Sequence, residues 1–364
     1  MSTDFWPDRV KVLTKQLGID YPIIQAPMAG GPSTPELAAA VSNSRALGSL
    51  GVGYLSPEQI ESEIRKVKEL TNKPFSINLF VPDRDVASQP SDKVLNRLKE
   101  FSEELGIDSP EIPSPPKYNF EDQLAVVIEN NVPIFSFTFG IPDKVLIKGL
   151  LERGVLVIGT ATCVEEGVSL EQAGCSAIVA QGSEAGGHRG TFGSTKGTPM
   201  VGGLALVPQL TDKVKIPIIA SGGIMDGRGI AASIALGAAA VQIGTAFLSC
   251  EEAGVPKPWL DTLLSSKDVS TVLTRAFSGK YARGIKNRFI DEMSFLEQEV
   301  ANYPVQNSLT RQIRNTAKEK QNSDFMSLWA GQGSAMSRKC TARELVSLLV
   351  SETYDVIKSM TSNL

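Results

Sequence analysis

Continuous apolar runs recur through the first two thirds of the chain, without alternating polar positions. A strand that is buried on both faces has this pattern, because neither of its faces meets water. The runs therefore predict eight strands of a parallel sheet that is covered on both sides. They are expected at 22–27, 47–53, 75–81, 133–139, 155–161, 177–182, 217–223 and 240–248.

Stretches that are typical of helices separate most of these runs. Ser56 and Pro57 open one of them, with a serine in the position that caps a first turn and a proline at the first helical position. Helices are predicted at 34–44, 56–70, 120–131, 142–154, 163–174 and 226–238.

A strand followed by a helix, repeated about eight times in about 230 residues, predicts a closed (β/α)8 barrel, which is the TIM-barrel fold. An open, doubly wound α/β sheet is the alternative. The first predicted strand is not followed by a G-x-G-x-x-G pattern, so the dinucleotide-binding version of the open sheet is disfavoured. We therefore expect the TIM barrel.

Two parts of the chain depart from the repeat. Residues 82–118 interrupt the third unit and predict one helix followed by an extended, proline-rich loop. This insertion is either a tolerated surface segment or a lid near the site. After about residue 249 the strands end, and the expected domains are the barrel at 1–256 and a mostly helical region at 257–364 that packs on it. Within the second domain, helices are expected at 258–266, 290–300, 308–320 and 341–361, and a short strand at 271–277.

Composition narrows the class of protein. The net charge of -4 offers no electrostatic basis for binding nucleic acid or an anionic membrane surface. No apolar run reaches the length of a membrane span, and the first residues lack the apolar core of a secretory leader. The four scattered cysteines predict neither a zinc site nor a disulfide framework. These features favour a cytoplasmic protein.

Candidate chemistry gathers where the predicted strands end, which is the functional face of a TIM barrel. Ser221, Gly222 and Gly223 end the seventh strand and lead into a helix, while Gly244 and Thr245 leave the eighth. Glycine backbone and a helix N-terminus can together bind a phosphate group. The alternative is a tight turn without a ligand.

Flavin mononucleotide (FMN) suits a barrel with one phosphate site, and its ring needs polar partners. Gln25, Asn78 and Gln181 could supply amide groups from three strands. The alternative for each amide is burial with all its hydrogen bonds made inside the protein.

His188 is the only histidine in the chain, and it stands in a glycine-rich loop after the sixth strand. Imidazole is the side chain best suited to proton transfer near neutral pH, so this position predicts a catalytic group. An exposed imidazole in a surface loop is the alternative. Glu184 could tune the imidazole or cap loop backbone, and we expect the second. No metal site is expected, because there is no second histidine and no carboxylate cluster.

Several separated motifs resemble those of class I nitronate monooxygenases, formerly called 2-nitropropane dioxygenases. They are QAPMAGGPST at 25–34, GSEAGGHRG at 182–190, ASGGIMDGRG at 220–229, QIGTAF at 242–247 and FSGKYARGIKNRF at 277–289. The resemblance implies an FMN enzyme that oxidises alkyl nitronates with O₂ to a carbonyl compound and nitrite through a flavin semiquinone. Detoxification of propionate 3-nitronate is the role it suggests.

The resemblance also implies roles for particular residues. His188 would be catalytic, either as a base or as an imidazolium that holds the nitronate, and it would contact substrate with Tyr303 and Lys280. The implied FMN contacts are Ala26, Pro27, Met28, Asn78, Gln181, Gly186, Gly187, Ser221, Gly222, Gly223, Gln242, Ile243, Gly244 and Thr245.

Other functions remain open at this point. An FMN-dependent NAD(P)H:quinone reductase and an enoyl-acyl-carrier-protein reductase share features of this loop, and a non-catalytic barrel could sense a phosphorylated metabolite. The MAGG and GGHRG motifs favour the monooxygenase. The partners expected are a small nitronate and O₂, and the chain could be a monomer or a dimer.

Overall fold

The computed structural model describes residues 5–82, 88–111, 117–193 and 198–361. Eight parallel strands form one barrel, in which each strand pairs with its neighbours in the order β1-β9-β8-β6-β5-β4-β3-β2. A bridge between Ile24 and Leu47 joins the two ends of this series and closes the ring. The strands are β1 (Ile23–Gln25), β2 (Gly48–Gly51), β3 (Phe75–Phe80), β4 (Ile134–Thr138), β5 (Leu156–Ala161), β6 (Ala177–Gln181), β8 (Ile218–Ser221) and β9 (Ala240–Ile243).

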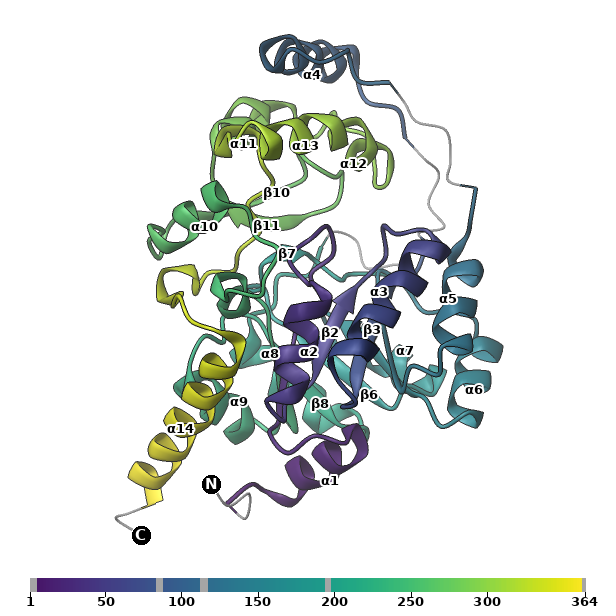
Figure 1. Cartoon of the computed structure of the whole chain (residues 1–364), viewed down its shortest axis with the longest axis vertical. Helices are drawn as coiled ribbons and strands as arrows, with labels where there is room; N and C mark the ends of the chain where they lie inside the picture. The colour runs from purple at the N-terminus through teal and green to yellow at the C-terminus, as the bar shows by residue number, and fades with distance from the viewer. Residues whose placement is uncertain (1–4, 83–87, 112–116, 194–197, 362–364) are drawn as a thin grey trace.

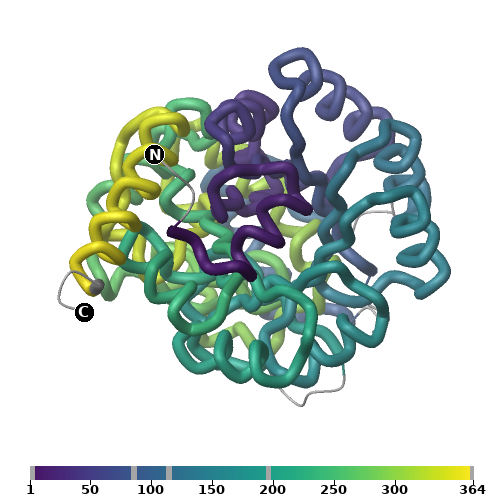
Figure 2. Tube along the Cα trace, turned by 90° about the horizontal axis from the view of Figure 1, so that it is seen from below, coloured from purple at the N-terminus to yellow at the C-terminus, as the bar shows by residue number. Residues whose placement is uncertain are grey.

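The predicted TIM barrel is confirmed, and the open sheet is wrong. Helices surround the strands, as the Cα trace shows when the molecule is seen from below (Figure 2). They cover the outer face because that face of every strand is apolar. These helices are α2 (Pro35–Asn43), α3 (Pro57–Leu70), α5 (Phe120–Glu129), α6 (Lys144–Glu152), α7 (Val164–Ala173), α8 (Gly203–Lys213) and α9 (Gly227–Ala235).

The amino-terminal helix closes the lower end of the barrel. Helix α1 (Asp8–Leu17) lies beneath the strands in Figure 1. Its Leu13 and Leu17 share a buried cluster with Ile24, Ile158 and Ile219 from inside the barrel. The apolar runs did not reveal α1 or α8, because neither is a continuous apolar segment. The site must therefore lie at the opposite, carboxyl end of the strands.

The eighth strand is shorter than predicted. β9 ends at Ile243, and the rest of the predicted strand forms a 3₁₀ helix, η1 (Thr245–Ser249). The apolar pattern continues through both elements because η1 is buried as well. The chain then makes a long excursion and returns as α14 (Ala342–Thr361), which packs against α9 and α2 in the place of an eighth barrel helix.

The excursion forms an upper region, which we define as residues 257–330 together with α4 (Asp92–Leu105) of the insertion (Figure 1). Its apolar core includes Phe101 from α4 and Phe277, Phe289 and Phe325 from the excursion. Its elements are α10 (Lys257–Leu264), β10 (Thr271–Thr274), β11 (Ala282–Ile285), α11 (Arg288–Met293), η2 (Ser294–Leu296), α12 (Val305–Leu309), α13 (Arg311–Glu319) and η3 (Ser323–Phe325); η4 (Ser334–Met336) follows it.

The two apolar cores do not divide the chain at residue 256. The predicted boundary between two domains at that residue stays a prediction. Apolar side chains of α14 belong to the barrel's core, whereas those of α4 belong to the upper region's core. The predicted helix of the insertion is present as α4, and its buried face argues against a purely decorative segment. Residues 83–87 and 112–116 of the insertion lie outside the described residues, and its action as a lid stays a prediction.

Candidate active site

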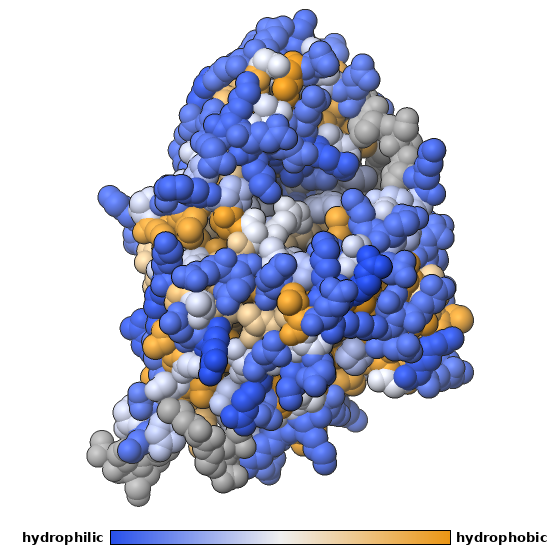
Figure 3. All heavy atoms as spheres, viewed as in Figure 1, coloured by the Kyte–Doolittle hydropathy of each residue, from blue (hydrophilic) through white to orange (hydrophobic). Residues whose placement is uncertain are grey.

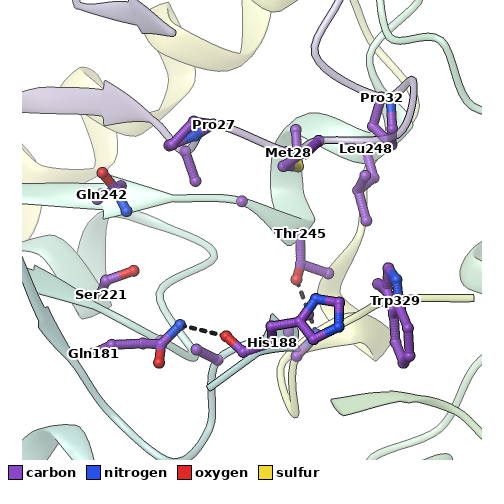
Figure 4. A pocket seen from close by; sticks show the side chains of 18 of the residues that line it. Pro27, Met28, Pro32, Gln181, His188, Ser221, Gln242, Thr245, Leu248 and Trp329 are labelled. Atoms are coloured by element: carbon purple, nitrogen blue, oxygen red, sulfur yellow. Dashed lines mark hydrogen bonds between the residues drawn. The ribbon is translucent and has the colours of Figure 1, made fainter. Parts of the chain in front are cut away.

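A cavity lies at the carboxyl ends of the barrel strands, between the barrel and the upper region. Side chains from neighbouring strands line one side of it, and His188 and Trp329 lie together on another (Figure 4). The structure brings His188 and all of the predicted FMN contacts to this one cavity. These contacts are Ala26, Pro27, Met28, Asn78, Gln181, Gly186, Gly187, Ser221, Gly222, Gly223, Gln242, Ile243, Gly244 and Thr245.

Glycine backbone at the ends of β8 and β9 forms a cradle on the barrel side. Gly222 and Gly223 have φ angles of 113° and 71°, in the region that glycine adopts without strain. A Cβ on Gly222 would lie 3.1 Å from the backbone nitrogen of Ala185. Among the described residues, no group accepts a hydrogen bond from the N–H of Gly222, Gly223 or Gly244. These groups can therefore bind an anion.

The predicted contribution of the following helix to phosphate binding is wrong. Helix α9 begins at Gly227, and the carboxylate of Asp226 accepts hydrogen bonds from Arg228 N and Gly229 N. The N–H of Gly227 donates to Glu352 of α14 at 3.0 Å. The first-turn donors of this helix are already paired, so the cradle consists of loop backbone alone.

Two of the three amides singled out from the sequence, Gln25 and Asn78, have different surroundings. Gln25 is fully buried and makes its hydrogen bonds with Ala26 O, Ser33 Oγ and Ser49 N, so it is a structural amide. Asn78 donates from Nδ2 to Ser136 Oγ at 2.9 Å and lines the cavity. Its Oδ1 has no hydrogen-bond donor among the described residues.

His188 lies on a short strand, β7 (Gly187–His188), that the apolar pattern did not predict. β7 pairs with β11, and β11 pairs with β10, so the upper region fixes the loop's backbone. Gly186 lets the loop lie close to the backbone of Ala330 and Gly331, because a Cβ on Gly186 would be 2.5 Å from both. The histidine is therefore part of an ordered sheet, and the flexible-loop alternative is wrong.

The tautomer of the imidazole depends on its hydrogen bond with Ser278. Nε2 of His188 lies 2.8 Å from Ser278 Oγ, and the Ser278 hydroxyl donates its single hydrogen to Lys280 O at 3.0 Å. With the Ser278 hydroxyl donating to Lys280 O, Ser278 accepts from His188 and the imidazole proton is on Nε2; a hydroxyl turned toward the ring would give the other tautomer. In the first arrangement, Nδ1 carries the lone pair and is the basic atom of the ring.

The surroundings of His188 keep its ring neutral. The rings of Phe139, Tyr303 and Trp329 have centroids 5.8, 6.1 and 5.4 Å from that of His188. Burial, and then the positive charges of Arg314 and Lys280, lower the pKa of His188 to about 3. All three effects disfavour the imidazolium.

The two predicted substrate residues lie beside the cavity rather than among the residues that line it. Tyr303 packs on Phe139 with ring centroids 5.6 Å apart, and burial raises its pKa well above the usual value. The Lys280 ammonium lies 4.9 Å from the centre of the Phe139 ring. Their role in substrate binding stays a prediction.

The family model for nitronate monooxygenase matches residues 11–352. A probable nitronate monooxygenase from Staphylococcus aureus (strain MSSA476) is 45% identical over 348 residues, which are 95% of this chain and 98% of that protein. A probable nitronate monooxygenase from Staphylococcus saprophyticus is 44% identical over the same shares. The chain belongs to the nitronate monooxygenase family.

Solved structures share the fold of this chain. A nitroalkane oxidase from Streptomyces ansochromogenes superposes with a TM-score of 0.89 at 36% identity, over 96% of this chain and 99% of that one. FabK from Thermotoga maritima gives a TM-score of 0.76 at 28% identity, over 97% and 99% of the two chains. The resemblance inferred from the motifs is confirmed, and this nitronate monooxygenase family member is an oxidoreductase.

One charged group of the site was missed in the sequence. Arg314 of α13 lines the cavity, and burial lowers its pKa to about 10. It donates from Nε to Thr310 Oγ1 and from Nη2 to Asn307 O and Oδ1. No carboxylate forms an ion pair with it among the described residues, and its Nη1 has no acceptor there. Helical periodicity places Arg314 one turn from Thr310, but nothing local points it into a cavity.

Backbone that returns from the upper region was also missed. Trp329, Gly331 and Gly333 line the cavity, and Gly331 N donates to Thr245 Oγ1 at 2.9 Å. The resemblance in 277–289 contains Ser278 and could have identified it as the histidine's partner. Glu184 caps backbone, as expected, because its carboxylate accepts from Gly203 N at the start of α8.

Among the described residues, no helix has both the length and the apolar character that crossing a membrane requires. In the same part of the chain, no three potential metal ligands come together. Hydrophilic residues dominate the face of the molecule seen in Figure 3, over both the barrel and the upper region.

Proposed function

We propose that the chain is an FMN-dependent nitronate monooxygenase that oxidises alkyl nitronates with O₂ to a carbonyl compound and nitrite. The observation that carries this proposal is a neutral, basic His188 in the same cavity as an unpartnered glycine cradle. The cradle fits a phosphate group, and Asn78 and Gln181 offer polar atoms to a ring system. The loop backbone at Gly222 and Gly223, with Asn78 and Gln181, would hold FMN, which would supply one-electron oxidation of the nitronate.

The residues of the chain would prepare the substrate for this step. Nδ1 of His188 can remove the acidic proton of a neutral nitroalkane and so form the nitronate in place. A pKa of about 3 leaves little imidazolium at neutral pH, but it also makes Nδ1 a weak base, so the pKa alone does not decide between the base role and the anion-holding role. Lys280 and Arg314 would then supply the positive charge that the nitronate needs.

Propionate 3-nitronate is a suitable substrate in this arrangement. It carries a carboxylate in addition to the nitronate group, and Arg314 lines the cavity with an Nη1 that has no acceptor among the described residues. Guanidinium groups bind carboxylates well because two N–H groups match two oxygens. The aromatic rings of Phe139, Tyr303 and Trp329 would exclude water from the reacting carbon.

The first test is the spectrum and reactivity of the purified protein. We expect a yellow protein that releases FMN on denaturation. Mixed without oxygen, propionate 3-nitronate should change the flavin absorbance rapidly, whereas NADH and NADPH should not. Rapid bleaching by either nicotinamide would instead assign the chain to the reductases, and a colourless protein that takes up no FMN would reject both.

We also propose that the protein works in the cytoplasm. Cys163, Cys175, Cys250 and Cys340 are all free thiols in the structure. Thiols persist in a reducing compartment. Activity of a cytosolic cell fraction, compared with a secreted fraction, tests this location.

A further inference from the structure

Arg189 is a buried cation whose position the proposed function does not explain. Its side chain is only 1% exposed, and burial lowers its pKa to about 10, so it stays charged at neutral pH. Nη1 donates to Gly182 O at 2.6 Å and to Gln181 O at 3.1 Å, and Nη2 donates to Pro199 O at 3.1 Å. No carboxylate forms an ion pair with it among the described residues. Burying such a charge is costly, and the nearby carboxylates of Glu166 and Glu184 stabilise it without forming an ion pair with it.

The contact that matters most joins Arg189 to the side chain of Gln181. Gln181 Oε1 accepts from Arg189 Nη1 at 3.1 Å and from Gly190 N at 2.8 Å. Two donors on this atom identify it as the amide oxygen and determine which way the amide faces. Nε2 must therefore occupy the other side of the group.

The two hydrogens on Nε2 of Gln181 differ in their hydrogen bonding. One is donated to His188 O at 2.9 Å, so the amide holds the backbone of the catalytic histidine (Figure 4). The other has no acceptor among the described residues, and Gln181 lines the cavity. The group that Gln181 offers to a ligand is therefore an N–H donor and not a carbonyl oxygen.

We propose that Arg189 is a positioning residue that orients and polarises the Gln181 amide toward both His188 and the flavin. A cation hydrogen-bonded to the amide oxygen makes the amide N–H a stronger donor. That donor would favour electron density on the flavin atom it faces, and so raise the flavin's reduction potential. This inference rests on the proposal that the cavity holds FMN.

Three variants separate positioning from general stability. Arg189→Met removes the charge and the donors at similar size. Gln181→Glu keeps an oxygen for Arg189 and Gly190 but removes both N–H groups. Arg283→Met is the matched control, because Arg283 is also buried, has a pKa lowered by burial and donates to Ser183 O, yet makes no contact with Gln181.

The measurements are the FMN dissociation constant, the midpoint potential of bound FMN by dye equilibration, and Tm. Arg189→Met and Gln181→Glu should each weaken FMN binding by roughly tenfold or more and make the potential more negative. Arg283→Met should lower Tm but leave the potential and FMN affinity unchanged. Arg189→Lys should lie between wild type and Arg189→Met, since it keeps the charge without the planar fork.

The outcomes distinguish this inference from the proposed function. A wild-type chain that binds no FMN would reject the proposed function. A wild type that binds FMN, with Gln181→Glu at the wild-type potential, would reject the inference alone. Arg189→Lys decides the case if Arg189→Met does not fold, because it also removes the planar fork that contacts Gln181. Where Arg189→Met and Gln181→Glu both fold, their double variant should show less than the sum of the single effects.

Discussion

The two walls of the cavity are built on different principles. The barrel wall, which we define as Gln181 with the loop backbone at 221–223 and 243–245, offers backbone and amide N–H groups. The upper wall, defined as His188, Trp329 and Arg314, offers rings and a cation, and Tyr303 and Lys280 pack beside it on Phe139. Neutral hydrogen-bond donors, as in the barrel wall, suit a cofactor that stays bound. Titratable and charged groups, as in the upper wall, suit a substrate that changes its charge. Binding of FMN and choice of substrate should therefore be separable by mutation.

The largest expected effect comes from the upper wall. His188→Asn should lower turnover of a neutral nitroalkane by about 10²–10⁴-fold, because asparagine cannot accept the proton. Turnover of preformed nitronates should also fall, but less. Released FMN per chain should stay at the wild-type value, since the barrel wall is intact. Wild-type oxidation rates with both substrates would remove His188 from the mechanism.

The next effect belongs to the barrel wall. Gly222→Ala adds a Cβ 3.1 Å from Ala185 N at a φ of 113°, so the cradle must shift. We expect the FMN dissociation constant to rise by roughly 10- to 100-fold, as measured by fluorescence titration. Gly154→Ala is the control, because it has a φ of 77° but a Cβ there meets nothing within 4 Å. It should cost about 1 kcal/mol of stability and leave FMN affinity unchanged. Equal loss of FMN in both variants would show that stability alone is responsible.

A smaller effect should separate substrates. Arg314→Met should raise KM for propionate 3-nitronate by about tenfold and change KM for ethyl nitronate much less, because only the former has a carboxylate. FMN affinity should not change. Lys99→Met, at an exposed lysine on α4 that pairs with Glu103, is the charge-matched control. An equal rise in KM for both nitronates in Arg314→Met would contradict the proposed contact between Arg314 and the substrate carboxylate.

The smallest effect is a shift along the pH axis. The base form of His188 is lost as pH falls through its pKa, and that pKa is about 3. kcat/KM for nitroethane should therefore stay level from about pH 8 to about pH 5, where an ordinary imidazole of pKa about 6.5 would already be protonated. Lys280→Met removes a repelling charge, so the fall should begin at a higher pH. A wild-type profile that falls near pH 6.5 would contradict the burial of His188.

Prediction from the sequence succeeded for the barrel wall because its information is local. Continuous apolar runs must be buried strands, and glycines such as Gly222 and Gly223 follow them directly. Parallel strands then bring all such loops to one end of the barrel. The helix N-terminus expected to bind phosphate is instead capped by Asp226, which is also a local effect. For Gln25 the sequence left a flavin contact and a buried structural amide open, and its hydrogen bonds lie inside the protein.

The upper wall could not be assembled in this way. Arg314, Ser278 and Trp329 come from three segments of the excursion, and they meet His188 only through the β7–β11 pairing and the aromatic core beneath α4. A two-residue strand has no periodicity to detect, and a helix such as α13 does not reveal which neighbour its buried face meets.

The sequence by itself determined the barrel, the family and the identity of the one histidine, since repeated local patterns and ordered motifs carry that information. Only the tertiary structure decided that His188 is neutral, that Ser278 contacts its Nε2 and that Gln181 presents an N–H. The first two properties depend on burial and on Ser278, which lies 90 residues from His188 in the sequence. The third depends on Arg189, a buried cation whose contact with Gln181 no sequence pattern predicts.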